Sequence, residues 1–431
     1  MSSSAGRVAV VGAGPSGLAA ARALARNGID WVGFELADDV GGLWNIDAPR
    51  STVYASAHLI SSRSTTEFTE FPMPAGTPDY PSHRELHAYF RGYADRFGLR
   101  DGFRFGTTVD AVVPRDDGRW DVTAGGTTAT YRAVVVANGT LAEPNVPTLP
   151  GGFGGTVLHS SAYKRPQAFT GRRVLVVGAG NSGCDIAVDL VHHAAAVDIS
   201  VRRGYHFVPK YVLGRPADTL NRGRPLPPRI KQFVDSRLLR LFTGDPARFG
   251  FPRPDHRLYE SHPVVNSLIL HHLGHGDLRV RPDVERLDGD GVVFTDGTRA
   301  GYDDVLLATG YRLHYPFLDP ALLNWDGRGG APDLYLNIVG PRAGLYVLGM
   351  IEASGIGWQG RYEQAELVAA HLAAPPAARA AFDSRAAGPR PDLSGGYRYL
   401  RLDRMAYYVN KDAYRRAVRA ETAALRGAGR G

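Results

Sequence analysis

The segment RVAVVGAGPSG, residues 7–17, decides the fold of this chain. Residues 7–11 form a continuous apolar, β-branched run, which is typical of a strand buried inside a parallel sheet. Glycines follow at once, and residues 18–28 continue in an alanine- and leucine-rich helical pattern that ends at a glycine. A strand, a glycine-rich turn and a helix in this order are the fingerprint of a dinucleotide-binding fold.

Each glycine of this turn has a role in such a fold. Gly12 makes the tight turn, Gly14 lets the backbone approach a pyrophosphate, and Gly17 lets the helix pack closely against the strand. Pro15 and Ser16 stand at the start of the helix, where free N–H groups and the helix dipole favour an anion. We therefore predict that these five residues hold the pyrophosphate of a dinucleotide.

A carboxylate follows where this fold binds a ribose. The next apolar run, residues 31–36, reads WVGFEL and places Glu35 near its end, 18 residues beyond Gly17. An acidic residue about 20 positions beyond the turn usually binds the ribose 2′-hydroxyl. Because an acid would repel a 2′-phosphate there, the first turn is predicted to bind an unphosphorylated adenosine, as in FAD or NAD.

The loop GGLW, residues 41–44, has two interpretations. Two glycines before a large aromatic residue suit a loop that lies against a flat ring, with Gly42, Leu43 and Trp44 in contact with a cofactor. The same residues also suit an ordinary turn with a buried tryptophan.

A second strand, glycine turn and helix begin at residue 172. The stretch RRVLVVGAGNSG, residues 172–183, repeats the spacing of the first motif. We assign the same pyrophosphate-binding role to its turn residues Gly178, Gly180, Asn181, Ser182 and Gly183.

The strand after this second motif ends in arginines. Arg202 lies 19 residues beyond Gly183, and Arg203 follows it. A guanidinium in the place of a carboxylate is what a 2′-phosphate requires, because arginine can clamp a phosphate bidentately. The second site is therefore predicted to bind NADPH, although a solvated strand end would give the same pattern.

Two dinucleotide sites in one chain indicate a redox protein that moves a hydride from NADPH to FAD. The predicted fold class is α/β, with two Rossmann-like domains and the NADPH domain inserted into a discontinuous FAD domain. We expect the first part of the FAD domain at residues 1–165. The NADPH domain is expected at 166–300, with a helical insertion at about 204–270. The second part of the FAD domain and a C-terminal helix are expected at 301–431.

Composition excludes several other classes of protein. The chain has 431 residues and one cysteine, so neither an intrachain disulfide nor a dithiol redox centre is possible, and a reducing, cytoplasmic location fits. No signal peptide or membrane span is predicted. The net charge is +7, with a basic excess near residues 202–231 that a phosphorylated cofactor explains without nucleic acid. No histidine cluster has metal-ligand spacing. The alanine- and proline-rich residues 375–393 are expected to form a loose surface segment.

At this point the chain resembles the flavin-containing monooxygenase family, a branch of the class B flavoprotein monooxygenases related to the Baeyer–Villiger enzymes. The resemblance runs from about residue 7 to about 370. Its most specific element is FGGTVLHSSAYK, which fits the family fingerprint between the two glycine motifs through Phe153, Gly155, His159 and Tyr163. The sequence ATGY at residues 308–311 is a second family signature. Tyr163 followed by lysine favours the N- and S-oxygenating branch over the Baeyer–Villiger branch.

The resemblance implies further contacts and a reaction. It places GGLW at the flavin, Val109 at the adenine and Gln364 among the cofactor-binding residues. His159 would either hold the hinge between the domains or be an ordinary structural histidine. The implied reaction uses NADPH, FAD and O2 to deliver one oxygen atom, through a flavin C4a-hydroperoxide, to a nucleophilic nitrogen or sulfur of a small molecule. The oligomeric state is left open, with a homodimer among the options.

One departure from the family bears on that reaction. The family often has an asparagine that helps to stabilise the peroxyflavin, and the aligned residue here is Ile60, which cannot donate a hydrogen bond. The nearby Ser61, Ser62 and His58 are the candidates to replace it. Three alternatives therefore stay open: Baeyer–Villiger oxygenation of a ketone, an NADPH oxidase that releases H2O2, and a non-catalytic dinucleotide sensor.

Overall fold

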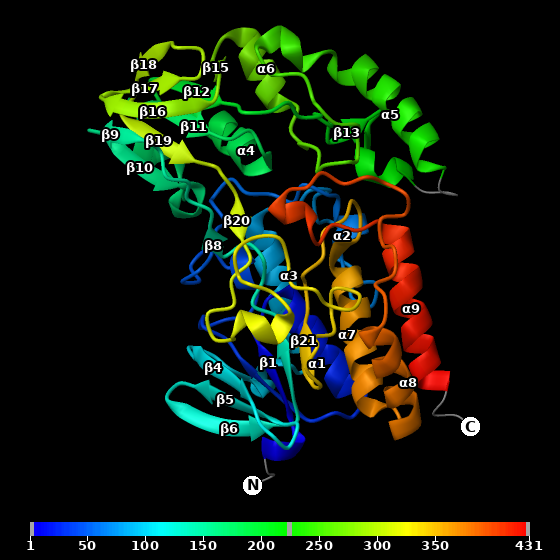
Figure 1. Ribbon diagram of the computed structural model, residues 1–431. Coiled ribbons are helices and arrows are strands. Elements are labelled where there is room, and N and C mark those ends of the chain that lie inside the picture. The colour runs from blue at the N-terminus through cyan, green and yellow to red at the C-terminus, as the bar shows by residue number, and fades with distance from the viewer. Residues whose placement is uncertain (1–3, 222–225, 428–431) are drawn as a thin grey trace.

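The computed structural model describes residues 4–221 and 226–427 and shows two α/β halves, each built on a five-stranded parallel sheet (Figure 1). The first sheet has the strand order β21-β7-β1-β2-β3. Its strands are β1 (Val8–Val11), β2 (Trp31–Phe34), β3 (Phe103–Arg104), β7 (Ala133–Val136) and β21 (Leu345–Val347). Because β21 returns to this sheet after the second half is complete, the prediction of a discontinuous first domain is confirmed.

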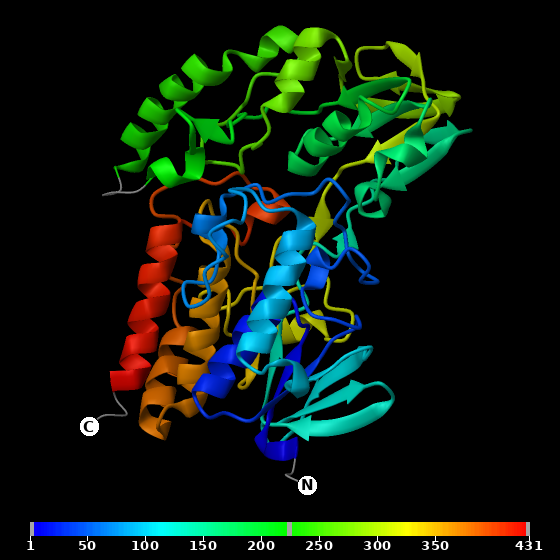
Figure 2. The ribbon, with the colours of Figure 1, turned by 180° about the vertical axis from the view of Figure 1, so that it is seen from behind.

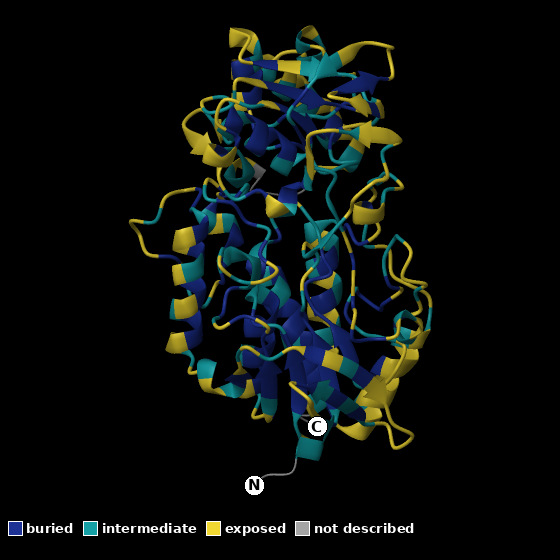
Figure 3. Ribbon diagram, turned by 90° about the vertical axis from the view of Figure 1, so that its left-hand side faces the viewer, coloured by how far each residue is buried: buried dark blue, intermediate teal, exposed yellow. Residues whose placement is uncertain are grey.

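Alternate side chains of β1 enter two different cores. Val8 and Val10 pack against the helices α1 (Pro15–Arg26), α3 (His83–Arg96) and α7 (Gly357–Ala373). Ala9 and Val11 pack on the other face, against the antiparallel strands β4 (Val109–Pro114), β5 (Trp120–Ala124) and β6 (Thr127–Tyr131). The sheet is therefore buried on both faces, as its β-branched sequence requires, and the views from the front, behind and the side show this layering (Figures 1, 2 and 3).

The second sheet repeats this arrangement in the upper half of Figure 1. Its order is β10-β19-β11-β12-β15, and its strands are β10 (Thr156–His159), β11 (Arg173–Val177), β12 (Ala196–Ser200), β15 (Leu278–Arg281) and β19 (Asp304–Leu307). Val174 and Val176 pack with α4 (Asn181–Leu190) and α6 (Leu268–His275). Leu175 and Val177 pack with a smaller sheet of β9 (Gly151–Phe153), β16 (Val284–Gly289), β17 (Gly291–Phe294) and β18 (Arg299–Gly301).

The pairing corrects the expected limits of the second domain. Strands β10 and β19 lie outside residues 166–300, yet both run parallel within the second sheet, where β19 pairs with β10 and β11. A short buried strand carries no local signal of which parallel sheet it joins, so the sequence pattern could not assign them. This sheet therefore takes its strands from residues 156–307.

The expectation of a loose segment at residues 375–393 was wrong for most of its length. Residues Pro376–Ala387 form α8, which buries Phe382 completely. The many alanines favour a helix, and Pro376 at the first helical position suits a helix start. The last helix, α9 (Lys411–Gly427), packs against α7 and α8.

The two chain crossings between the halves lie side by side. The outgoing strand β8 (Glu143–Pro144) pairs antiparallel with the returning strand β20 (Tyr311–Arg312). Next to them, the Asn145 N–H donates to the Gly310 carbonyl oxygen (2.9 Å), and the Thr309 hydroxyl donates to the Asn145 carbonyl oxygen (2.6 Å). These bonds make one hydrogen-bonded hinge from the two crossings.

The insertion at 204–270 contains β13 (Tyr211–Val212), β14 (Arg215–Pro216) and the helix α5 (Pro228–Thr243); residues 222–225 of the basic stretch lie outside the described part. Helix α5 turns polar side chains toward the protein: Gln232 is buried and donates to the Leu258 carbonyl oxygen (3.0 Å). Its apolar Phe233 and Leu241 face outward. In the described residues, no helix combines the length and apolar character needed to cross a membrane.

Candidate cofactor and active site

The first glycine turn requires glycine at two positions for steric reasons. Gly12 has φ 102°, and a Cβ there would lie 2.7 Å from the Ala137 carbonyl oxygen. A Cβ on Gly17 would lie 1.8 Å from the carbonyl oxygen of Gly12. Gly14 is the N-cap of α1 and no side chain caps this helix end, while Pro15 begins the helix. The first N–H groups of α1 are therefore available to an anion, as a pyrophosphate site needs.

Glu35 lies directly beside this turn. The Gly12 N–H donates to the Phe34 carbonyl oxygen (2.8 Å), which brings the end of β2 to the turn. The Glu35 carboxylate accepts hydrogen bonds from the N–H groups of Ala13 (2.5 Å) and Ala37 (2.8 Å). Burial of this side chain raises the pKa of its carboxyl group, although the backbone bonds oppose that effect. The carboxylate is thus fixed next to the turn, and its contact with a ribose stays a prediction.

The GGLW loop packs on the same turn, backbone against backbone. The Gly41 N–H donates to the Ala13 carbonyl oxygen (3.0 Å), and a Cβ on Gly42 would lie only 3.0 Å from the Gly14 Cα. Trp44 is half-buried and contacts the cores of both halves, and Leu43 is packed against the second core. The loop therefore lies on the first glycine turn with its tryptophan between the two halves, and its contact with a cofactor stays a prediction.

Three other residues assigned to the first site, Val109, Ser16 and Gln364, are buried and differ in their contacts with the protein. Val109 is buried at the start of β4, and the nearby Thr107 N–H donates to the Glu35 carbonyl oxygen (2.8 Å), so this strand begins beside Glu35. The Ser16 hydroxyl lies against Gly349, where a Cβ would come within 2.4 Å of it.

Gln364 is completely buried, and both its polar atoms have protein partners. Its amide oxygen accepts from the Gly349 N–H (2.9 Å), and its amide nitrogen donates to the Tyr414 hydroxyl (2.7 Å). Gln364 therefore fixes the backbone opposite Ser16, and its direct contact with a cofactor stays a prediction.

The second glycine turn repeats the geometry of the first. Gly178 has φ 104°, and a Cβ there would lie 2.6 Å from the Ala308 carbonyl oxygen. A Cβ on Gly183 would lie 2.0 Å from the Gly178 carbonyl oxygen. Gly180 is the N-cap of α4 without a side-chain cap, and a Cβ on it would meet no atom within 4 Å. This helix end is therefore also open to an anion.

Asn181 and Ser182 follow at the start of α4. The Asn181 amide accepts from the Val265 N–H (2.8 Å) and donates to the Pro263 carbonyl oxygen (3.3 Å), so its side chain holds the insertion in place. Ser182 is half-buried in the first turn of the helix.

The structural counterpart of Glu35 in the second half is Val201. The Val201 N–H donates to the Arg281 carbonyl oxygen (2.9 Å), just as the Glu35 N–H donates to the Arg104 carbonyl oxygen (3.0 Å). Arg202 therefore follows one residue beyond the counterpart of Glu35, in agreement with its offset of 19 rather than 18 residues, and Val201 itself is buried in the apolar core.

The two arginines are in different states. Arg202 is exposed, and within the described part of the chain its guanidinium makes no hydrogen bond or ion pair. Arg203 is paired with Asp255, with 3.3 Å between guanidinium nitrogen and carboxylate oxygen. Arg202 is thus the side chain that is free to meet a phosphate.

His159 joins the end of β10 to the hinge. Its Nδ1 accepts from the Ser161 N–H (3.1 Å), so its Nε2 carries the proton and donates to the Gly310 carbonyl oxygen (3.0 Å). Burial lowers the pKa of this imidazole. Both ring nitrogens are used by the protein in the neutral form, which fits a positioning role.

The rest of the fingerprint is also structural in its contacts. Gly155 has no room for a side chain, because a Cβ would lie 2.3 Å from the Asp303 carbonyl oxygen, and Phe153 packs on the smaller sheet. The Tyr163 hydroxyl donates to Asp189 of α4 (2.6 Å). The ammonium of Lys164 donates to the carbonyl oxygens of residues 51 and 53 (2.7 and 3.0 Å). This segment therefore ties α4 to the loop after GGLW.

The three residues proposed to replace the family asparagine have protein partners. Ser62 is buried at the N-cap of α2 (Arg63–Thr66), and both its N–H (2.8 Å) and its hydroxyl (3.0 Å) donate to Asp218 of the insertion. The Ser61 hydroxyl bonds the Thr66 hydroxyl (2.8 Å). His58 is exposed, and its Nδ1 donates to the Ser56 carbonyl oxygen (2.6 Å). Their contact with a flavin stays a prediction.

Two acidic residues that the sequence did not single out join the halves. Asp218 receives the bonds from Ser62, and Asp185 of α4 accepts from Asn266 (2.6 Å) and from the Tyr54 hydroxyl (3.3 Å). Burial raises the pKa of Asp185. No local pattern marks such residues, since their partners lie 81 to 156 positions away in the chain.

Two parallel sheets, each with a glycine turn and an open helix end at the carboxyl end of a central strand, are the architecture of a two-domain flavoprotein oxidoreductase. The chain belongs to the flavin-binding monooxygenase-like family, whose model matches residues 5–371. It is therefore a flavin-dependent monooxygenase.

Individual relatives agree with that assignment. Flavin-containing monooxygenase 5 of Oryctolagus cuniculus is 34% identical over 381 residues, which cover 81% of this chain and 70% of the relative. Indole-3-pyruvate monooxygenase YUCCA1 of Oryza sativa subsp. japonica is 35% identical over 368 residues, covering 81% and 87%.

Solved structures show the same fold at lower identity. S-allyl-L-cysteine S-oxygenase from Allium sativum superposes with a TM-score of 0.67 at 21% identity and covers 97% of this chain and 88% of that protein. Oxidized steroid monooxygenase bound to NADP superposes with a TM-score of 0.71 at 22% identity, covering 98% of each.

Proposed function

We propose that this protein binds FAD at the first glycine turn and NADPH at the second, and transfers one oxygen atom of O2 to a nucleophilic nitrogen or sulfur of a small molecule. The observation that carries the proposal is the difference in charge between two otherwise equivalent turns. Glu35 lies beside the first turn, and Arg202, which has no partner among the residues that the structure describes, lies beyond the second. An acid suits a free ribose 2′-hydroxyl, and an arginine suits a 2′-phosphate.

FAD supplies hydride acceptance and oxygen activation when it is bound. The chain's own residues would hold it by the open N-terminus of α1, with Gly12, Gly14 and Gly17 allowing close approach of the backbone. Trp44, half-buried between the two cores, would help to exclude water from the reacting ring. Exclusion of water matters because it keeps activated oxygen for the substrate instead of releasing it as H2O2.

NADPH would be held by the open N-terminus of α4 and by Arg202 at its 2′-phosphate. Arg203 contributes less, because Asp255 already pairs with it. His159 would act at a distance as a positioning residue, since its bond to the Gly310 carbonyl oxygen fixes the hinge that sets one half against the other.

The test of this function measures products and H2O2 together. Flavin-loaded enzyme is supplied with NADPH, O2 and, in separate reactions, a tertiary amine, a sulfide or a cyclic ketone. We expect an N-oxide or sulfoxide in near-equal amount to the NADPH consumed. An ester or lactone from the ketone as the main product would instead establish Baeyer–Villiger chemistry.

A second candidate function is favoured by Ile60. Its side chain cannot donate the hydrogen bond that the family asparagine supplies, so oxygen transfer could be replaced by NADPH oxidation. One H2O2 per NADPH with every substrate would establish an oxidase. An Ile60→Asn variant that releases less H2O2 and forms more oxygenated product per NADPH would then show that Ile60 causes the oxidase activity.

A further inference from the structure

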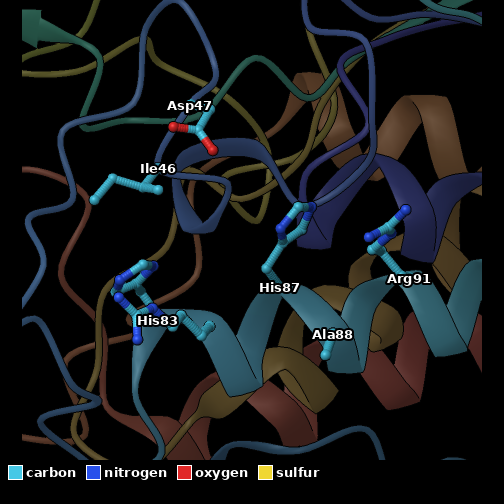
Figure 4. A pocket seen from close by; sticks show the side chains of 7 residues that line it. Ile46, Asp47, His83, His87, Ala88 and Arg91 are labelled. Atoms are coloured by element: carbon cyan, nitrogen blue, oxygen red, sulfur yellow. The ribbon is translucent and has the colours of Figure 1, made fainter.

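A basic pocket lies behind the GGLW loop, on the first half of α3. Its volume is about 250 Å³, and it is lined by His83, Arg84, His87 and Arg91 of the helix together with Ile46 and Asp47, which follow the GGLW loop (Figure 4). The lining contains no residue of either glycine turn. The His87 ring lies against Gly41 of the GGLW loop, 3.0 Å from the place of a Cβ on that residue. Helix α3 thus stands behind the loop whose front we assign to the flavin.

His83 is the most informative residue of this pocket. It is 3% exposed, and its Nε2 has no hydrogen-bond partner among the described residues. Buried imidazole nitrogens are normally hydrogen-bonded, and an unpaired one in a native protein points to a ligand or a functional role. The pocket beside it has room for a group of several heavy atoms, since a cavity volume of only about 10–15 Å³ holds a single water.

The other charges around the pocket leave it electropositive. Within the described chain Arg84 has no hydrogen bond or ion pair. The carboxylate oxygens of Asp39 lie 2.9 Å from a guanidinium nitrogen of Arg91, 2.7 Å from one of Arg100 and 3.3 Å from the Nε2 of His87. One carboxylate therefore faces three basic groups. Asp47 offsets part of this charge, and the Glu85 carboxylate in the capping box of α3 compensates the positive end of the helix dipole. Burial, Arg84, His58 and His87 together lower the pKa of His83, so the protein alone disfavours its charged form.

We propose that this pocket binds a phosphate group, held by the Nε2 of His83 and by the side chains of Arg84 and His87. A phosphate supplies acceptors for the unpaired imidazole and for a guanidinium that has no partner, and it compensates the excess positive charge. The phosphate comes either from inorganic phosphate or from a phosphate monoester, and the pocket chemistry is the same for both. This inference does not depend on which substrate the enzyme oxygenates.

The test is calorimetric titration of flavin-loaded enzyme at constant ionic strength. The probes are inorganic phosphate, glycerol 3-phosphate and acetate, with chloride as the background salt. We expect saturable binding of phosphate at one site, and about tenfold or greater loss of affinity in the His83→Gln, Arg84→Ala double variant. Tenfold tighter binding of glycerol 3-phosphate than of phosphate would identify a monoester as the source, and equal or weaker binding would identify free phosphate.

Arg96→Ala is the matched control. It removes the same charge from the same helix about 18 Å farther along its axis, so phosphate binding should be unchanged. If the double variant does not fold, the Arg84→Ala single variant replaces it in the titration, because the exposed Arg84 has no partner among the described residues. The flavin absorbance spectrum of the single variant verifies that it is folded. No saturable phosphate binding, equal loss in Arg96→Ala, unchanged binding in the folded Arg84 variants, or tighter binding of acetate than of phosphate would overturn the proposal.

Discussion

Replacing Arg202 by alanine should separate the binding of NADPH from that of NADH. This guanidinium has no partner within residues 4–221 and 226–427, so its loss should leave the fold intact. A hydrogen bond between charged groups is worth about 1.5–3 kcal/mol, and about 1.4 kcal/mol is a tenfold change in Kd. Because Arg202 is exposed and screened by water, we take the lower end, about 1.5–2 kcal/mol, or roughly a 10- to 30-fold weaker Kd for NADPH.

The assay is titration of each nucleotide against flavin-loaded wild-type and variant protein, followed by the KM of each. The Kd for NADH should change less than about twofold, because NADH has no 2′-phosphate to lose a contact. Arg203→Ala should have a smaller effect on NADPH, since Asp255 already holds that side chain. Arg286→Ala, which removes an exposed arginine from β16, is the control and should have none. Equal weakening of NADPH and NADH by Arg202→Ala would refute the reasoning.

Three further predictions concern stability and the glycine turns. Gly17→Ala should destabilise the protein by about 1–3 kcal/mol and abolish co-purified flavin, because its Cβ would overlap the Gly12 carbonyl oxygen; urea unfolding and flavin absorbance measure the two effects. Gly180→Ala should cost less than about 1 kcal/mol, because its Cβ meets no atom and only the N-cap preference for glycine is lost. Phe382→Ala should lower the free energy of unfolding in urea by about 3–5 kcal/mol, because α8 buries this ring fully. Leu241 is 79% exposed, so Leu241→Ala should change that free energy by less than about 0.5 kcal/mol, and equal losses in the two variants would contradict the burial of Phe382. The pKa of His262 is lowered to about 4, mainly by burial, so its imidazole binds more protons in the unfolded protein than in the folded one. The free energy of unfolding should therefore fall as the pH drops from 6.5 to about 4. His262→Gln should reduce the slope of that free energy against pH by up to about 1.4 kcal/mol per pH unit, and an unchanged slope would exclude His262 as a cause.

The parts of the fold that were predictable are those whose cause is local. Gly12 and Gly178 adopt positive φ next to a carbonyl oxygen, and the glycines five positions later have no room for a Cβ. These constraints act within a few residues, so the sequence records them directly as a repeated motif. The alternation of the two faces of each sheet is local in the same way, because every central strand is buried on both sides.

The one-residue difference between the two offsets has a structural cause. Glu35 lies 18 residues beyond Gly17 and Arg202 lies 19 beyond Gly183, because Val201 is the counterpart of Glu35. The side chain of Val201 enters the core, so the charge moves to the next, exposed position. Binding of a 2′-phosphate by Arg202 stays a prediction, which the exposure of this side chain permits.

Contacts between distant segments could not be predicted. Strands β10 and β19 join the second sheet through pairings about 148 positions apart, and Ser62 meets Asp218 across 156 positions. Serine is common at helix N-caps and aspartate is common on surfaces, so neither residue type signals such a bond. The pocket on α3 was equally hidden, because its basic side chains read as the polar face of an ordinary helix.

The central claim is that two nucleotides meet so that a hydride passes from one to the other. Mixing the flavin-loaded protein with NADPH without oxygen, and following the visible absorbance of the flavin, measures this step alone. The account predicts complete bleaching at one NADPH per flavin and recovery of the yellow colour when O2 is admitted. Saturable binding of NADPH that leaves the flavin absorbance unchanged would contradict it and would indicate a dinucleotide-binding protein without the proposed chemistry.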